Sequence, residues 1–197
     1  MGKSRLEAFS DGVLAIILTI MVLELPEPHG DTLEALQALT PKLLNYLLSF
    51  LYIGIYWNNH HHLLHTVRKV TGGILWANLH LLFWLSLLPF TTAWMGEHHN
   101  SSIPTALYGA MMLASAIAYT ILEWRIIRNE GKGSLLARAV GTNIKGYGSI
   151  ALYVAGIAVA FAAPWLAQCF YALVALVWFI PDRRIERVFA NEPDAES

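Results

Sequence analysis

Cysteine and charged side chains are both scarce in this chain of 197 residues. Cys169 is the only cysteine, so no intramolecular disulfide can hold a secreted scaffold together. Charged residues make up 14% of the chain and hydrophobic residues 56%, whereas a soluble domain has about 25% charged residues. A soluble domain of this size could not bury such an apolar surplus, because much of its surface stays wet. The composition predicts one membrane-embedded domain.

Neither sign of charge dominates, since 13 Lys and Arg residues stand against 14 Asp and Glu residues, a net charge of −1. A nucleic-acid-binding surface needs a basic excess, so no nucleic-acid partner is expected. The sequence also has no glycine-rich nucleotide loop and no recognisable catalytic triad. We therefore expect neither an enzyme nor a bound cofactor.

Apolar runs that could cross a membrane recur along the chain, each near the roughly 20 residues that a spanning helix needs. Residues 72–96 have His80 as their only ionisable side chain, and residues 103–122 and 147–166 have no charge. The shorter run 43–57 is expected to lie inside one helix from about residue 32 to residue 64. A further run, 166–180, follows Pro164, which breaks the preceding helix and favours a hairpin.

The first apolar segment is short, because residues 12–23 are bounded by Asp11 and Glu24. With Lys3 and Arg5 before it, the segment could be the core of a secretory signal. Asp11 interrupts the apolar stretch, however, and the Leu-Glu-Leu-Pro sequence of residues 23–26 is a poor cleavage site. We expect a retained first helix with a polar start.

Six spans would place all the basic residues except Lys42 on the side of the two termini. Lys and Arg gather on the cytoplasmic side of membrane proteins, so both termini are predicted to be cytoplasmic. The predicted fold class is an all-α membrane protein with six transmembrane helices. The six-helix transmembrane domain is predicted to cover residues 1–189, and residues 190–197 are expected to form a short, acidic, disordered tail.

An apolar stripe follows one face of the first predicted helix. At about 100° per residue, Phe9, Ile16, Ile20 and Leu23 share this face and Thr19 borders it. Asp11 lies about 140° from Ile16 and points away. A stripe of this kind is most often packed in a core or against lipid, so spacing alone does not assign it to a pore.

Asp11 needs a partner, because an ionisable group in a membrane segment costs a few kcal/mol unless it meets one or reaches water. Asn78 of the third span is one candidate, and hydration at the membrane edge is the alternative. The other candidates form a polar cluster at the end of the second span: Trp57, Asn58, Asn59, His60, His61, His62 and His65. His60 and His61 lie about 100° apart, so the choice between them stays open.

The run Arg5-Leu6-Glu7-Ala8-Phe9-Ser10-Asp11 resembles the R-x-x-x-F-S-D signature of the transmembrane protein 175 family, the lysosomal and bacterial potassium-permeable channels. Trp57-x-x-His60-His61 is similar to the second-helix pattern of that family. Asn78-Leu79 and Pro89-Phe90 resemble its third helix. The last three predicted helices carry no motif of the family.

The resemblance implies a homotetramer in a lipid bilayer, in which first helices line a pore for potassium and other monovalent cations. A single repeat favours a bacterial plasma membrane. The family lacks the carbonyl filter of ordinary potassium channels, and this chain has no T-V-G-Y-G run. By resemblance, the constriction is formed by Ile16, Thr19, Ile20 and Leu23.

A ring of four isoleucines can close a pathway, because water and ions leave a narrow apolar neck. Glu24 is expected to attract cations at the outer mouth, or else to belong to a solvated acidic loop. The remaining motif residues are expected to hold the first helix against the second and third spans; they are Arg5, Phe9, Ser10, Asp11, Trp57, His60, His61 and Asn78.

Two rival interpretations remain. His61 and His65 have the i, i+4 spacing of many helical metal ligands, but His60, His61 and His62 point in three directions, so no metal site is expected. A proton-coupled transporter could use Asp11 and a histidine of the second span as a relay. Such carriers usually show inverted repeats or paired broken helices, and Pro89 is the only proline well inside a span.

The stripe assignment can be tested by cysteine labelling in a chain whose Cys169 is replaced by serine. A cysteine in place of Ile16 should react with a water-soluble thiol reagent, because a pore-facing position reaches water. Labelling is measured with the reagent on either side of the membrane. An unreactive Ile16→Cys chain, alongside a reactive cysteine within residues 72–96, contradicts the assignment.

Overall fold

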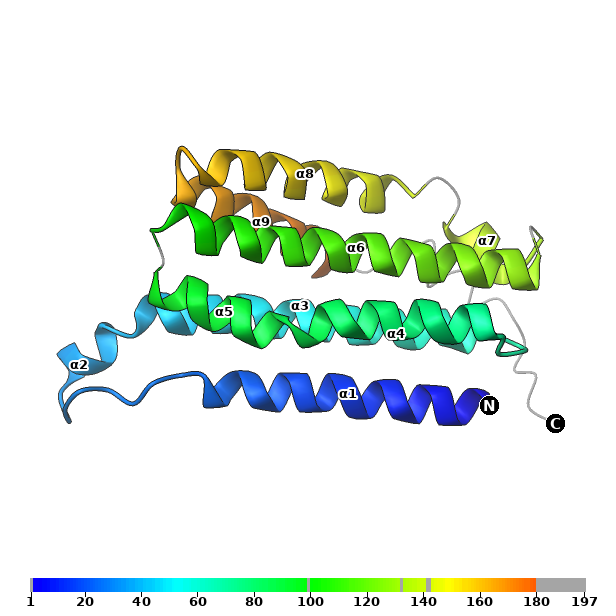
Figure 1. The fold of residues 1–197 in the computed structure, drawn as a ribbon, viewed down its shortest axis with the longest axis horizontal. Coiled ribbons are helices and arrows are strands. Elements are labelled where there is room, and N and C mark those ends of the chain that lie inside the picture. The colour runs from blue at the N-terminus through cyan, green and yellow to red at the C-terminus, as the bar shows by residue number, and fades with distance from the viewer. Residues whose placement is uncertain (1, 99, 132, 141–142, 180–197) are drawn as a thin grey trace.

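The computed structural model describes residues 2–98, 100–131, 133–140 and 143–179. Within these residues the regular secondary structure is helical. Most of the helices run side by side along the long axis of the molecule (Figure 1). The predicted domain end at residue 189, the tail 190–197 and the basic residues Arg183, Arg184 and Arg187 lie outside the described residues.

The helices follow one another in this order: α1 (Lys3–Leu23), α2 (Leu33–Gln37), α3 (Thr40–His65), α4 (Gly72–Ser86), α5 (Leu88–Glu97), α6 (Ser102–Glu130), α7 (Leu135–Val140), α8 (Ile144–Ala160) and α9 (Pro164–Phe179). Three spans are long and apolar enough to cross a membrane within the described residues: α1, α4 with α5, and α6. Helices α8 and α9 are apolar but shorter. A topology of six spans must therefore also count α3, α8 and α9.

The prediction of one helix over about residues 32–64 is wrong. The structure has two helices there, α2 and α3, which are separated at Ala38 and Leu39. Thr32 begins the first, because its hydroxyl accepts a hydrogen bond from the Ala35 N–H at 3.3 Å. Pro41 lies in the first turn of α3, where its missing N–H costs nothing.

Prolines also divide the two later spans. The predicted span 72–96 consists of α4 and α5, which meet at Leu87, two residues before Pro89. The predicted span 147–166 ends earlier, at Ala160, and Pro164 starts α9. In the other direction, α6 continues past residue 122 to Glu130. A proline lacks a backbone donor, so it ends a helix more sharply than apolar composition indicates.

Four fully buried tyrosines form the centre of the part of the bundle built from α3, α6, α8 and α9: Tyr52, Tyr108, Tyr153 and Tyr171. The Tyr52 hydroxyl donates to the Tyr171 carbonyl, and the Tyr171 hydroxyl donates to the Thr105 carbonyl at 3.2 Å. The Tyr108 hydroxyl lies 3.0 Å from that of Ser49. Such bonds are needed here, because an unpaired buried hydroxyl is costly.

Helix α1 lies at one edge of the bundle, with α8 at the opposite edge (Figure 1). It packs against α3, α4 and α5. Because its neighbours lie on one side, its other side is left open in the single chain. This edge position determines which side chains of α1 are available for function.

The ring of Tyr171 fits closely between two glycines, so Gly109→Ala should destabilise the bundle. A Cβ at Gly109 would lie 2.1 Å from the Tyr171 hydroxyl oxygen and 2.9 Å from Cγ1 of Ile157. Overpacking of this kind costs about 1–3 kcal/mol, which lowers the midpoint of thermal unfolding in detergent. Gly54→Ala is the control, because nothing lies within 4 Å of its Cβ position. Equal midpoints for the two variants would contradict the packing.

Candidate functional site

Helix α1 has a buried face and an exposed face. The buried face consists of Leu6, Ser10, Leu14, Ile17 and Met21. The exposed face carries the predicted stripe: Phe9 is 46% exposed, Ile16 58%, Ile20 41% and Leu23 78%. Thr19 is exposed as well. Large apolar side chains open to this degree mark a surface that another copy, lipid or a pathway must meet.

The Thr19 hydroxyl is satisfied within its own helix. It lies 3.1 Å from the Ala15 carbonyl oxygen and 3.0 Å from that of Ile16, and it donates to this pair. A threonine bonded to the preceding turn presents no unpaired donor to its surroundings. The exposed face is therefore apolar in character from Ile16 to Leu23.

A groove of about 650 Å³ runs between α1 and the α4–α5 segment. Ile16 and Ile20 of α1 line it, together with Glu24, the residue that caps the end of this helix. Phe90, Trp94 and Glu97 line it from α5, and the other lining residues are Val13, Ile17, Ser86, Pro89 and Ala93. Glu24 follows the last residue of α1 and Glu97 is the last residue of α5. Both carboxylates therefore lie at one end of the groove.

Lys42 lies beside this acidic end, with its Nζ 3.7 Å from Glu97 Oε1. The Glu97 side chain stays 60% exposed, so water screens the pair strongly. Glu24 has no ion pair within the described part of the chain. Glu97 was not predicted at this site, because helical spacing on α1 gives no information about the end of α5.

A buried chain of hydrogen bonds joins α1, α3 and α4. Asn78 Nδ2 donates to Ser10 Oγ at 2.9 Å, and Ser10 Oγ donates to the Leu6 carbonyl at 2.9 Å. His60 Nε2 lies 2.6 Å from Asn78 Oδ1. Since Nδ2 is the donor of the Asn78 amide, its oxygen accepts, and His60 must carry the proton on Nε2.

Asp11 has a different partner. Its Oδ1 accepts a hydrogen bond from Trp57 Nε1 at 3.0 Å, so a second bond joins α1 to α3. Asp11 is half-buried, whereas Ser10 next to it is fully buried. No hydrogen bond joins Asp11 to a histidine among those recorded for the described residues.

The structure separates the two histidines that the sequence left as alternatives. His60 is buried at 2% exposure. His61 is exposed and stacks on Trp57, with ring centroids 6.4 Å apart and planes at 29°. Its ring also lies near those of His62 and His65, at 5.7 and 6.5 Å. Three consecutive histidines therefore have different environments, because only one of them faces α4.

Other motif residues lie on the surface. Arg5 is exposed, and Phe9, expected to help pack α1, lies on the open face instead. Lys3 contacts α3, since its Nζ donates to the His65 carbonyl at 2.7 Å and lies 3.9 Å from Glu7. A cation at a helix carboxyl end is favourable. Sequence reasoning missed Lys3 because its partner is a backbone atom.

No group of three or more His, Cys, Asp or Glu side chains that could hold a metal ion occurs among the described residues. The clustered histidines of α3 contact one another and Trp57 through their rings.

Comparison with known proteins gives consistent matches. The family model described as endosomal/lysosomal potassium channel TMEM175 matches residues 5–89. A protein named potassium channel from Chryseobacterium sp. (strain P1-3) is 60% identical over 187 residues, which is 95% of this chain and 97% of the relative. The endosomal/lysosomal proton channel TMEM175 of Gallus gallus is 36% identical over 116 residues, 51% of this chain and 23% of that protein.

A solved structure is similar over most of the fold. The crystal structure of a lysosomal potassium-selective channel TMEM175 homolog from Chamaesiphon minutus has a TM-score of 0.79 and 27% sequence identity. The match covers 90% of this chain and 96% of the other chain. The similarity therefore extends beyond the motif-bearing residues to α6, α8 and α9.

Asn78→Leu should destabilise the protein, because it leaves His60 and Ser10 buried without their partner. Loss of one partner from a buried hydrogen bond costs about 1–3 kcal/mol. Thermal unfolding in detergent measures the change, with Asn58→Leu as the control, since Asn58 is exposed on α3. If both variants unfold at the same temperature, the buried chain does not hold α1.

Proposed function

This chain belongs to the TMEM175 family, an ion-channel family, and on that premise we propose that it forms a potassium-permeable pore from four copies of α1. It is an all-helical membrane protein and not an enzyme. Its bacterial relatives fit a bacterial membrane, and we place it in the plasma membrane. The name potassium channel, carried by a relative of almost the same length, supports potassium as the permeant ion.

The observation that carries the proposal is the open apolar face of α1. Ile16, Ile20 and Leu23 are exposed, while the opposite face is buried against the same chain. In a symmetric tetramer each residue of the stripe occurs four times around the axis. Closed rotational symmetry of this kind is common in homo-oligomers.

A ring of four Ile16 side chains acts as the gate in this proposal. A narrow apolar neck loses its water, and an ion cannot cross without a hydration shell. No carbonyl filter takes part, so selectivity follows the cost of dehydration. Potassium and caesium, which shed water more easily than sodium, pass better. Ile20 and Leu23 extend the neck, and Thr19 borders it.

The polar contacts of α1 support a gate that moves while its base stays fixed. Ser10 and Asp11 bind α4 and α3, one to two turns before Ile16. Beyond them the buried face consists of Leu14, Ile17 and Met21, which are held by apolar contacts. Apolar contacts have no fixed direction. A small rotation of this half opens the neck without breaking a buried hydrogen bond.

The topology completes the proposal, with six spans and both termini in the cytoplasm. The amino-terminal end of α1 lies beside the end of α3, where Arg68 and Lys69 follow. Glu24 and Glu97 lie at the other end and form the outer mouth. Carboxylates at a channel mouth raise the local concentration of cations.

A proton-coupled carrier finds less support in the contacts of Asp11. A relay needs a hydrogen-bonded path from Asp11 to a histidine. Asp11 bonds instead to Trp57, and His60 bonds to Asn78. No observation favours the carrier over the channel.

The test is a potassium flux assay in proteoliposomes that compares the native chain with Ile16→Asn. The native chain should release potassium passively down its gradient. Ile16→Asn should raise the flux several-fold and reduce the preference for potassium over sodium, because a ring of four asparagine side chains keeps the neck hydrated. Val22→Asn is the matched control, since Val22 is 47% exposed on α1 but about 120° from Ile16.

If Ile16→Asn and Val22→Asn change the potassium flux equally, the stripe does not line the pathway. Flux that requires an opposing proton gradient would replace the channel with the carrier and turn Asp11 into a relay.

A further inference from the structure

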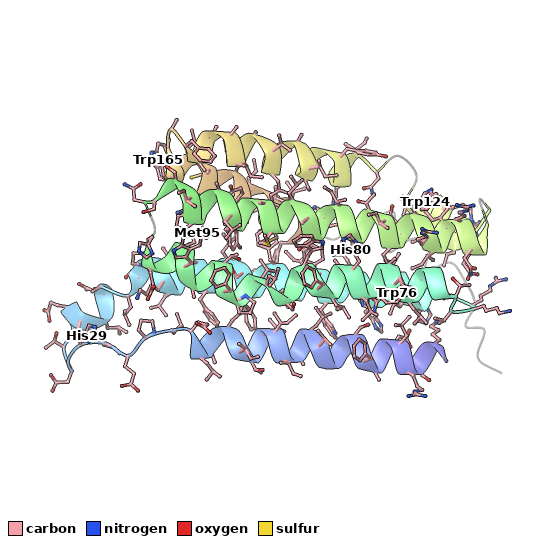
Figure 2. The ribbon with its side chains drawn as sticks, in the orientation of Figure 1. His29, Trp76, His80, Met95, Trp124 and Trp165 are labelled. Atoms are coloured by element: carbon pink, nitrogen blue, oxygen red, sulfur yellow. The ribbon has the colours of Figure 1, made fainter. Side chains whose placement is uncertain are left out.

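A basic and aromatic patch lies where α6 ends and where the α3–α4 connection meets it. We call the following residues the α6 patch: Trp124, Arg125 and Arg128 of α6, with Arg68 and Lys69 of the connection. All five are exposed. Trp124 and Trp76 lie toward the same end of the bundle, and Trp165 lies toward the other (Figure 2).

Both arginines of α6 lie against the indole ring of Trp124. The guanidinium carbon of Arg125 is 5.2 Å from the ring centroid, and that of Arg128 is 5.4 Å away. These distances fall within the range of cation–π contacts. Arg125 also reaches α4, since its Nη1 lies 3.7 Å from the Cβ position of Gly73. The ring and the first turn of α4 thus fix the position of two positive charges.

The α3–α4 connection is fastened to the same end of α6. Asn129 Nδ2 donates to the Lys69 carbonyl at 3.2 Å, and the Arg68 N–H donates to Glu130 Oε1 at 3.1 Å. The Glu130 carboxylate accepts from this N–H and from Asn129 Nδ2, both neutral donors, so it keeps its negative charge beside the patch. Within the described residues, no carboxylate forms a recorded ion pair with any cation of the patch. The four basic residues outnumber the Glu130 carboxylate, so the patch stays net positive.

An exposed stripe on α6 leads into the patch. Ile117 is 41% exposed, Ile121 37% and Trp124 50%, and Arg128 follows one turn later. Spacings of four, three and four keep these residues on one helix face. Their order is apolar, aromatic and then basic, which is the order of layers from the lipid tails through the interface to the headgroups.

The length of α6 agrees with this placement. Ile103, 65% exposed, lies near the start of α6. From Ile103 to Trp124 the helix rises about 32 Å, close to the roughly 30 Å thickness of the hydrocarbon layer. Trp124 thus reaches the interface, and Arg125 and Arg128 reach the depth of the phosphates.

We infer that the α6 patch is a binding site for the headgroup of an anionic phospholipid. The guanidinium groups of Arg125 and Arg128 hold the phosphate, because Arg offers paired N–H donors that match its oxygens. Arg68 and Lys69 add positive charge, and an acyl chain lies along Ile121 and Ile117. The amino-terminal end of α4 contributes potential of the same sign. The site does not depend on α1 forming the pore.

Native mass spectrometry of the purified protein in a neutral detergent tests the site. Dioleoyl phosphatidylglycerol should bind the native chain more tightly than dioleoyl phosphatidylcholine does. Arg125→Gln/Arg128→Gln should weaken phosphatidylglycerol binding about tenfold, through the loss of charge-assisted hydrogen bonds. Trp124→Leu, which keeps both charges, should weaken it less. Arg125→Lys/Arg128→Lys, which keeps both charges, should bind more tightly than the glutamine double variant. It also tests whether the fold tolerates substitution at both positions.

Arg5→Gln is the matched control for Arg128→Gln, because Arg5 is exposed in the first turn of α1, which starts at the end of the bundle where α6 stops (Figure 1). Equal losses in these two single variants would mean general surface charge and would overturn the site. If glycerol phosphate competes as strongly as phosphatidylglycerol, the assignment of a lipid ligand is overturned and the site binds soluble phosphate. Potassium flux is not part of this measurement, so a failed flux assay leaves the lipid site standing.

Discussion

The hydrogen-bonded chain from the Leu6 carbonyl through Ser10 and Asn78 to His60 is the constraint on which the orientation of α1 depends. Ser10 and Asn78 are wholly buried. In an apolar bundle, a buried polar group that loses its partner cannot turn to water, so the bonds permit one rotation of α1. At that rotation Ile17 faces the bundle and Ile16 faces outward. The stripe is open because the face that carries Ser10 packs against α3 and α4.

The two parts of the bundle are held by different forces. The tyrosine core of α3, α6, α8 and α9 combines close ring packing with directional hydrogen bonds, and Gly109 and Gly156 let the ring of Tyr171 approach two helices. Helix α1 has polar contacts at one end and apolar contacts along the rest. The proposed gate agrees with this division, because movement of the apolar half of α1 breaks no buried hydrogen bond.

The two ends of the bundle differ in charge. Glu24 and Glu97 lie at the end where α1 and α5 stop, and the α6 patch lies at the end where α6 stops. This separation would favour cations at one mouth and anionic headgroups at the other. Such an asymmetry also orients helical bundles in membranes, so in the proposed channel one charge pattern would serve both topology and ion attraction.

Local properties were readable from the sequence: the membrane class from the scarcity of charge, the stripe on α1 from its spacing, and the family from the run Arg5–Asp11. Proline effects were underestimated, so the break before Pro41 was missed. Tertiary structure alone selected His60 over His61, paired Asp11 with Trp57, left the stripe open and brought Glu97 to the same groove as Glu24. Helical periodicity determines which residues share a face, but only packing between helices decides what that face meets.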